Sequence, residues 1–263
     1  MNQIVGAQLY TIREQVKTVD DFITSMEKLK KIGFEYIQFS GVTAPLEPKQ
    51  VKEILDRYGL KIACSHMPWE RLYQEPEKVA EENLEMGCPI VGLSWYPENR
   101  LDTKENSVEY IKRLQKIGKS LKQNGVQFVL HNHWMEFHRY DGKAVLDHIF
   151  DETDPEEVQF ILCCYWAQFA GADPIDYIYK YKGRIPCVHY KDMIVLGVED
   201  KATFAPIGQG NMNYKAIWKA CEETGVQYAM IEQDQCLTDP FDCLAMSREY
   251  MLSLGEAYDR EKE

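Results

Sequence analysis

Several features that would assign a protein to a particular class are absent from this sequence. No apolar run reaches the roughly 20 residues that a membrane-spanning helix needs, and no basic segment leads into an apolar signal core before Ile4. The eight cysteines include no Cys-x-x-Cys pair, so free thiols in a reducing compartment are expected. We therefore expect a cytoplasmic protein with no membrane partner.

Positive charge is also in short supply. The chain has 30 Lys and Arg against 42 Asp and Glu, a net charge of −12, and its basic residues are scattered. Because proteins that bind nucleic acids through their phosphates carry a basic face, we expect no nucleic-acid partner. The 263 residues fit a single α/β barrel, a fold that commonly spans about 250 residues.

Short segments rich in Val, Ile, Phe and Tyr alternate eight times with longer amphipathic stretches, one of which is Val108–Leu121. Four helix-to-strand junctions carry Gly33, Gly59, Gly125 or Gly225, where a left-handed C-cap is expected. No glycine-rich dinucleotide fingerprint supports an open sheet, so we predict one (β/α)8 TIM barrel over residues 1–263. The predicted strands are Ile4–Leu9, Tyr36–Phe39, Lys61–Ser65, Ile90–Trp95, Gln127–His131, Gln159–Cys163, Ile185–Tyr190 and Tyr228–Glu232.

Polar side chains gather where these predicted strands end, which is where α/β barrels carry their active sites. Only His138 and His148 of the six histidines lie elsewhere. Because scattered structural histidines would not segregate in this way, the pattern indicates a functional site. The strand-end residues include Gln8, Gln38, His66, Trp95, His131, His133, Cys163, His189, Lys191, Glu232 and Asp234.

Imidazole and carboxylate side chains that converge from several strands suit a divalent metal such as Mn²⁺, Mg²⁺ or Zn²⁺. His189 and Glu232 each end a predicted strand, His131 ends the fifth, and Glu136 follows in the same loop. No local spacing motif such as His-Glu-x-x-His links them. A metal held there would polarise a carbonyl and stabilise the enolate that forms when a neighbouring C–H loses its proton.

Seven segments distributed over essentially the whole chain carry a resemblance to a known group of enzymes. They are Gln8-Leu9-Tyr10-Thr11-Ile12-Arg13, His131–Phe137, Tyr165-Trp166, Ala170–Pro174, Gly183–Asp192, Ile207–Asn211 and Ile231–Asp234. With these segments the chain resembles the sugar phosphate isomerase/epimerase superfamily of xylose isomerase-like TIM barrels. That superfamily includes ketose 3-epimerases, inosose dehydratase and endonuclease IV. The resemblance implies an enzyme of carbohydrate metabolism that uses a divalent metal.

The resemblance also implies four metal ligands: a Glu from strand five, an Asp from strand six, a His from strand seven and a Glu from strand eight. His189 and Glu232 match the last two, whereas Cys163 stands at the position of the Asp. At strand five, Glu136 and His131 are alternatives. A thiolate at Cys163 would favour Zn²⁺ over Mg²⁺ or Mn²⁺, and a neutral thiol would leave the metal weakened or lost. Both outcomes are compatible with the sequence.

These expectations combine into one hypothesis, a sugar isomerase or epimerase that acts on a keto-sugar or related polyol derivative through an enediolate. Glu232 and Glu136 would hold the metal and serve as acid and base, and His133 would polarise the carbonyl or shuttle a proton. The carbohydrate is the predicted partner, and a homo-oligomer is compatible with the sequence. The predicted substrate-binding residues are His66, Trp95, Trp166, Arg184, Lys191 and Gln8.

Two alternatives stay open at this point. The first is a lyase or dehydratase that uses the same enolate chemistry on an inosose or a 3-keto-glycoside. The second is a sugar-binding relative that has lost catalysis, which Cys163 and the Gln209 of Gly208-Gln209-Gly210 favour because relatives carry Asp and Glu there. The trinuclear zinc site of endonuclease IV is not expected, since Trp166 stands where a ligand histidine would be.

Overall fold

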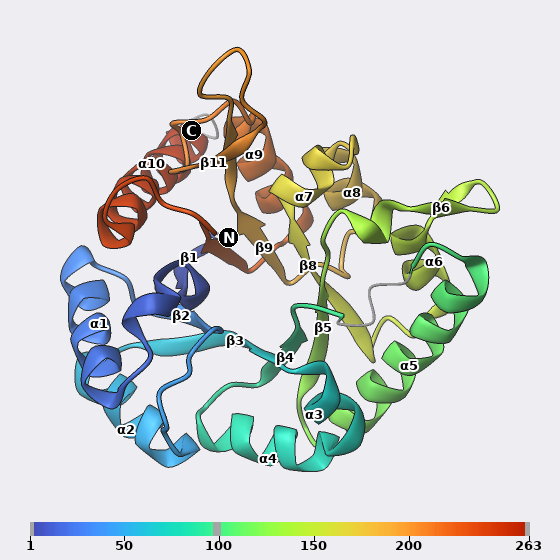
Figure 1. Cartoon of the computed structure of the whole chain (residues 1–263), viewed down its shortest axis with the longest axis horizontal. Coiled ribbons are helices and arrows are strands. Elements are labelled where there is room, and N and C mark those ends of the chain that lie inside the picture. Colours follow the sequence, from blue (N-terminus) through green and yellow to red (C-terminus); the bar gives the residue numbers. More distant parts are fainter. Residues whose placement is uncertain (1–2, 97–100, 261–263) are drawn as a thin grey trace.

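Eight parallel strands close into a barrel in the computed structural model, which describes residues 3–96 and 101–260 (Figure 1). Around the barrel the strands follow the order β1-β12-β9-β8-β5-β4-β3-β2. This architecture confirms the predicted (β/α)8 TIM barrel. The strands are β1 (Ile4–Gln8), β2 (Tyr36–Phe39), β3 (Lys61–Met67), β4 (Ile90–Leu93), β5 (Gln127–His131), β8 (Val158–Cys163), β9 (Cys187–Tyr190) and β12 (Tyr228–Ile231).

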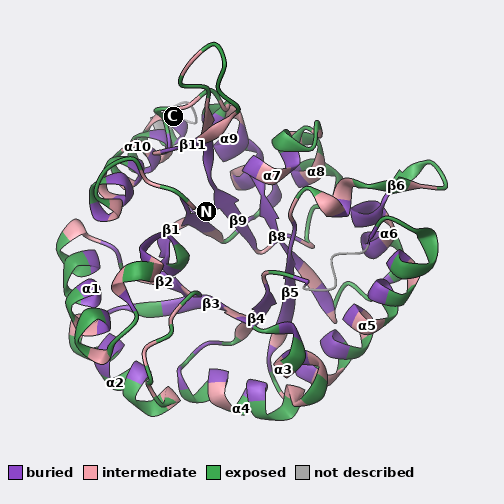
Figure 2. Cartoon of the chain, in the orientation of Figure 1, coloured by how far each residue is buried: buried purple, intermediate pink, exposed green. Residues whose placement is uncertain are grey.

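Helices surround the barrel, and their buried faces point toward the strands (Figure 2). The predicted helix Val108–Leu121 lies inside α5, which buries Ile111, Leu114, Ile117 and Leu121 on one face. No helix in the described ranges is long and apolar enough to cross a membrane. The outer helices are α1 (Val19–Ile32), α2 (Pro48–Tyr58), α4 (Pro76–Glu85), α5 (Lys104–Gln123), α6 (Val145–Glu152), α8 (Pro174–Lys180), α9 (Tyr214–Thr224) and α10 (Pro240–Arg260).

The predicted glycine caps are found at three of the four junctions. Gly33, Gly59 and Gly225 end α1, α2 and α9 in the left-handed conformation, which glycine adopts without a steric cost. At the end of α5 the C-cap is Asn124 instead, and the left-handed residue is Gly125 directly after it.

Short elements that the sequence pattern did not predict occupy the loops after several strands. Two are 3₁₀ helices, η1 (Leu9–Gln15) and η2 (Met135–Phe137), and two are α-helices, α3 (Trp69–Gln74) and α7 (Cys164–Phe169). The loops also contain two antiparallel hairpins. The first pairs β6 (Arg139–Tyr140) with β7 (Lys143–Ala144), and the second pairs β10 (Asp192–Ile194) with β11 (Thr203–Ala205). All of these elements are too short to show a periodic pattern.

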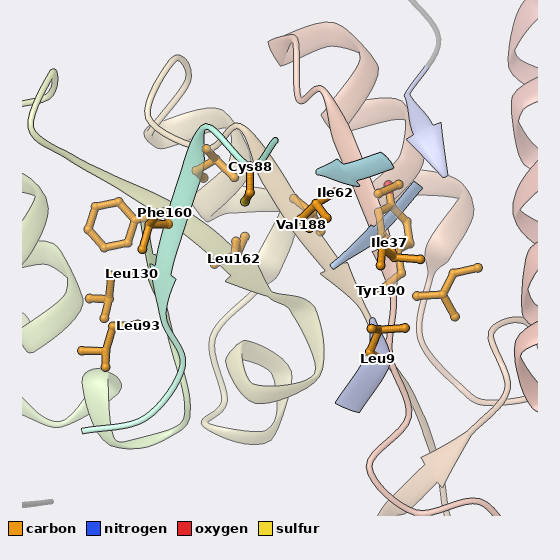
Figure 3. Close-up of a cluster of buried hydrophobic side chains, with 14 of the residues drawn as sticks. Leu9, Ile37, Ile62, Cys88, Leu93, Leu130, Phe160, Leu162, Val188 and Tyr190 are labelled. Carbon is orange, nitrogen blue, oxygen red and sulfur yellow. The ribbon is translucent and has the colours of Figure 1, made fainter. Parts of the chain in front are cut away.

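Side chains alternate along the barrel strands and so separate two cores. Outward-facing residues such as Leu130, Leu162, Val188 and Tyr190 pack beneath the helices (Figure 3). A second, smaller cluster lies inside the barrel, and it contains both Ala63 and Cys64, where the register between β2 and β3 shifts by one residue. This cluster, which we call the barrel plug, consists of Ala63, Cys64, Val129, Ile161, Cys187 and Met230.

Candidate active site

Four potential metal ligands converge just beyond the barrel plug. His131, Cys163, His189 and Glu232 each offer one ligand atom, and these atoms all lie within 4.8 Å of one another. Each residue lies two positions after a plug residue on the same strand or at its end, so the period of two that directs the plug inward also directs the ligands inward. All four side chains are buried. We call this group the ligand cluster.

The amide of Gln38, on β2, fixes the orientation of two imidazoles. His189 donates from Nε2 to Gln38 Oε1 at 2.7 Å, and Gln38 Nε2 donates to His66 Nε2 at 2.8 Å. His66 Nδ1 then donates to Ser40 Oγ at 3.2 Å. The amide oxygen of Gln38 can only accept and its nitrogen can only donate. His189 therefore carries its ring hydrogen on Nε2, and His66 carries its ring hydrogen on Nδ1. We call this arrangement the Gln38 clamp.

The Gln38 clamp leaves the ligand cluster with buried lone pairs that face one another. With its hydrogen on Nε2, His189 points the Nδ1 lone pair at Glu232 Oε2, 2.9 Å away. His131 donates from Nδ1 to Ser94 O at 3.4 Å, and its Nε2 has no hydrogen-bond partner in the described part of the chain. Buried acceptors without a shared proton repel each other and cost free energy. A divalent cation would satisfy them, so these residues fit a metal.

The thiol of Cys163 completes the cluster as its softest ligand atom. Burial raises the pKa of Cys163 to about 12, so without a metal the side chain is a neutral thiol near pH 7. A bound metal would have to displace that proton, because the thiolate is the form that coordinates.

An ammonium group lies against the cluster on its open side. Lys191 Nζ is 2.7 Å from Glu232 Oε2 and 2.8 Å from Asp234 Oδ1, and Lys191 is almost completely buried. Burial alone would lower the pKa of Lys191, but the nearby carboxylates hold it above its usual value. Burial alone would likewise raise the pKa of Glu232, but the Lys191 ammonium group holds it well below its usual range. Lys191 and Glu232 therefore stay charged as a buried pair.

His66, His131 and His133 are neutral at physiological pH. Burial lowers the pKa of His66 and of His131 well below the usual value, and it lowers the pKa of His133 to about 3. Neutral imidazoles keep a lone pair for a metal or for a substrate hydroxyl.

The cluster opens into a cavity of about 370 Å³, which we call the inner cavity. Aromatic rings form one wall: the His133 ring lies 4.9 Å from the Trp95 ring, and Trp134 lies 4.8 Å from Trp166, measured between centroids. Such a wall suits the C–H face of a sugar. The lining residues are Tyr10, Ser40, His66, Ser94, Trp95, His131, His133, Trp134, Trp166, Lys191, Glu232 and Asp234. The structure thus brings the predicted residues His66, Trp95, Trp166 and Lys191 to one cavity, together with His133.

Glu136, predicted as a metal ligand and catalytic residue, lies outside both the ligand cluster and the inner-cavity lining. Its carboxylate turns back beneath the loop after β5, where Oε2 accepts a hydrogen bond from the backbone N–H of His133 at 2.8 Å. Burial raises the pKa of Glu136 to about 7. Of the two alternatives for a strand-five ligand, the structure brings His131 into the cluster.

Two predicted substrate-binding residues also lie elsewhere. Arg184 precedes β9, so it lies at the opposite end of the barrel, where it donates to Val158 O at 2.8 Å and to Phe150 O at 3.0 Å. Gln8 is buried at the end of β1, where its Oε1 accepts from the backbone N–H of Tyr10 at 3.3 Å. Neither residue lines the inner cavity. The substrate-binding residues proposed below therefore do not include Arg184 and Gln8.

Comparison with known proteins identifies the family. The model of the xylose isomerase-like TIM barrel family matches residues 26–235. The chain belongs to this family. This result confirms the resemblance seen in the sequence, because the match covers most of the chain.

Individual relatives share low sequence identity with this chain. An inosose dehydratase of Lacticaseibacillus casei is 24% identical over 272 residues, which cover 89% of this chain and 88% of that protein. A sugar phosphate isomerase/epimerase from Parabacteroides distasonis superimposes with a TM-score of 0.80 at 22% identity, over 95% of this chain and 93% of that one. A xylose isomerase-like TIM barrel protein from Mycobacterium smegmatis, solved in complex with magnesium, has a TM-score of 0.74 at 16% identity, over 97% of both chains.

Proposed function

We propose that this chain is an enzyme that moves a proton on a carbon next to the carbonyl group of a keto-sugar or an inosose-like ring, as an isomerase or epimerase working through an enediolate. The observation that carries the proposal is the group of four buried ligand atoms that lie within 4.8 Å of one another at the base of a cavity with an aromatic wall. The names of the relatives agree with a sugar-modifying enzyme.

In this proposal His131, Cys163, His189 and Glu232 hold a divalent metal, in agreement with the magnesium complex of one structural neighbour. When bound, the metal would polarise the substrate carbonyl and stabilise negative charge on its oxygen. The Gln38 clamp keeps the Nδ1 lone pair of His189 directed at the cluster.

The groups that can take up or return the proton are Glu232, Asp234 and His133, all of which line the inner cavity. Lys191 joins the two carboxylates through its ammonium group and is placed to donate a hydrogen bond to a substrate oxygen. Trp95 and Trp166 would stack against the sugar ring. Glu136 has no part in this scheme, because its carboxylate is bonded to the loop backbone.

A second candidate is a dehydratase, which the curated relatives favour because they are named inosose dehydratases. Elimination of water begins with the same proton removal and then needs an acid for the departing hydroxyl group. Asp234 lines the inner cavity, and burial and the nearby Glu232 raise its pKa, so in its protonated form it could supply that proton. The two reactions therefore share one site and differ in what leaves the enediolate.

Solvent hydrogen exchange separates these functions. The protein, loaded with Mn²⁺, Mg²⁺ or Zn²⁺, is incubated in deuterated water with ketoses, inososes and 3-keto-glycosides, and the products are followed by mass spectrometry and NMR. An epimerase returns a deuterated isomer, whereas a lyase also releases water or an aglycone.

Glu232→Gln should lower the exchange rate at least about 100-fold, because it removes a metal ligand and a potential base. The matched control is Glu81→Gln, which changes an exposed residue on α4 and should exchange like the wild type. No exchange with any member of the panel and any of the three metals would contradict the proposal and favour a sugar-binding protein.

A further inference from the structure

A second, larger cavity adjoins the inner cavity. It has a volume of about 680 Å³, against about 370 Å³ for the inner cavity, and we call it the outer chamber. The two share Tyr10, Ser40, His66, Ser94 and Trp95, so they meet beside the ligand cluster. The outer chamber is formed by the loop between β2 and α2, the segment from the end of β3 into α3, and α4, which occupy the lower part of Figure 1.

The outer chamber adds apolar side chains that do not line the inner cavity. Besides its aromatic wall, the inner cavity is lined by imidazoles, carboxylates and an ammonium group. In the outer chamber, part of the wall is apolar and is made by Phe39, Val42, Leu46, Met67, Trp69 and Met86. Hydroxyl groups placed against this apolar part would lose hydrogen bonds to water without replacement, so this part of the wall favours an apolar ligand group.

The charges at the outer chamber disfavour an anionic ligand. Arg71 is the one Lys or Arg side chain among its described lining residues, and its guanidinium is already engaged by Glu75 at 2.5 Å and Glu82 at 2.9 Å. Glu47, Glu70 and Glu82 also belong to the lining. A phosphate group would therefore meet carboxylates and no free cation, unlike the basic surroundings that phosphates usually require.

We propose that the outer chamber binds an apolar substituent carried by the sugar, so that the substrate is an uncharged keto-sugar derivative such as an aryl or alkyl glycoside. This inference rests on the proposed function, because the sugar ring would occupy the inner cavity. Pockets for drug-sized ligands span roughly 300–1,000 Å³. The inner cavity, at about 370 Å³, already reaches that range, and the outer chamber, at about 680 Å³, leaves room for a second group.

The test compares the methyl and phenyl glycosides of one 3-keto-sugar. Calorimetry measures their dissociation constants with the metal-loaded protein, and the rate of hydrogen exchange is measured for both. The phenyl glycoside should bind at least about tenfold more tightly, a difference that corresponds to about 1.4 kcal/mol. The 6-phosphate of the methyl glycoside should bind more weakly than the methyl glycoside itself.

Val42→Trp places a bulky ring in the outer chamber and should reduce the preference for the phenyl glycoside to about one. Val42→Ala enlarges the chamber and should keep the preference, which controls for folding of this loop. Val198→Trp is the matched control, because Val198 is fully exposed and is absent from the linings of both cavities, and this variant should behave like the wild type.

The outcomes for the outer chamber and for the proposed function are distinct. Equal affinity for the two glycosides, tighter binding of the phosphate, or a phenyl preference that survives Val42→Trp would each overturn the outer-chamber proposal, even if hydrogen exchange is observed. A phenyl preference that Val42→Trp abolishes, with no exchange in any ligand, would support the outer chamber and count against the proposed enzymatic function.

Discussion

Replacing Gln38 by Leu should weaken metal binding although Gln38 is not itself a metal ligand. The side chain is fully buried, and it is the group that accepts the Nε2 hydrogen of His189 at 2.7 Å. Leu has a similar volume but can neither accept nor donate. Without the acceptor, His189 gains by moving its hydrogen to Nδ1, where Glu232 Oε2 lies 2.9 Å away. That hydrogen would then occupy the lone pair that the metal needs.

The size of the effect follows from this competition. Groups that orient a ligating histidine contribute about 10–100-fold to metal affinity. The same factor corresponds to about 1.4–2.8 kcal/mol. The Gln38 clamp belongs at the upper end of the range, because it also orients His66, and because the tautomer it disfavours gains a hydrogen bond to a buried carboxylate.

Two measurements check this prediction. Competition with a fluorescent chelator gives the Zn²⁺ and Mn²⁺ affinities of both proteins, and ¹⁵N NMR of the imidazoles gives the tautomer of His189 without metal. The wild type should show Nε2–H, and Gln38→Leu should show Nδ1–H. Gln38→Glu is the control for the acceptor, because its carboxylate still accepts from His189 although it no longer donates to His66, and it should retain more metal affinity than Gln38→Leu. Unchanged affinity and an unchanged tautomer in a folded Gln38→Leu protein would refute the reasoning.

Three further predictions follow from the buried groups. Cys163→Asp should shift metal preference from Zn²⁺ toward Mn²⁺ or Mg²⁺, measured by elemental analysis after competitive loading; identical preference in both proteins would contradict ligation by the thiol. Because burial raises the pKa of Glu136 to about 7, the folded protein keeps a proton that the unfolded chain releases near the ordinary pKa of 4.5, so stability falls as pH rises through this interval. Glu136→Gln should remove this loss of stability, which amounts to up to about 3 kcal/mol. In urea unfolding, the free energy of unfolding of the variant should exceed that of the wild type by an amount that grows from pH 4.5 to 7.5. A difference that stays constant over this pH range would contradict the raised pKa. Gly118→Ala should destabilise the protein by about 1–3 kcal/mol although alanine favours helices, because its Cβ would clash with the Glu157 carbonyl oxygen. The control is Lys119→Ala, at an exposed position on the same helix, which should change stability by less than about 0.5 kcal/mol. Equal effects of the two substitutions in urea unfolding would contradict the clash.

The barrel and much of the site could be predicted from the sequence because both follow from short-range periodicity. A strand alternates its side chains, so an inward Cys187 implies an inward His189, and an inward Met230 implies an inward Glu232. The same rule applies to Ile161 and Cys163. Parallel strands bring their carboxyl ends together, and the residues that end them must therefore meet.

The residues that could not be placed correctly depend on loop geometry or on contacts across the barrel. Glu136 lies in η2, five residues beyond His131, where the turn of the chain decides whether the carboxylate faces the cavity or the backbone. Gln38 joins His189 over a separation of 151 residues, which no local pattern encodes. The position of Arg184, in contrast, could have been predicted from the sequence. Arg184 precedes its strand, and residues before a parallel strand lie at the end of the barrel opposite the active site.

The barrel plug bears on the order in which the proposed metal and substrate would bind. Its six apolar residues lie inside the barrel beneath the ligand cluster, so both would reach the cluster from the inner cavity. A metal ion would then have to arrive before the sugar, because a bound sugar would cover that route. The bound sugar would also hold the ion in place, so retention of the metal would depend on the substrate as well as on the protein.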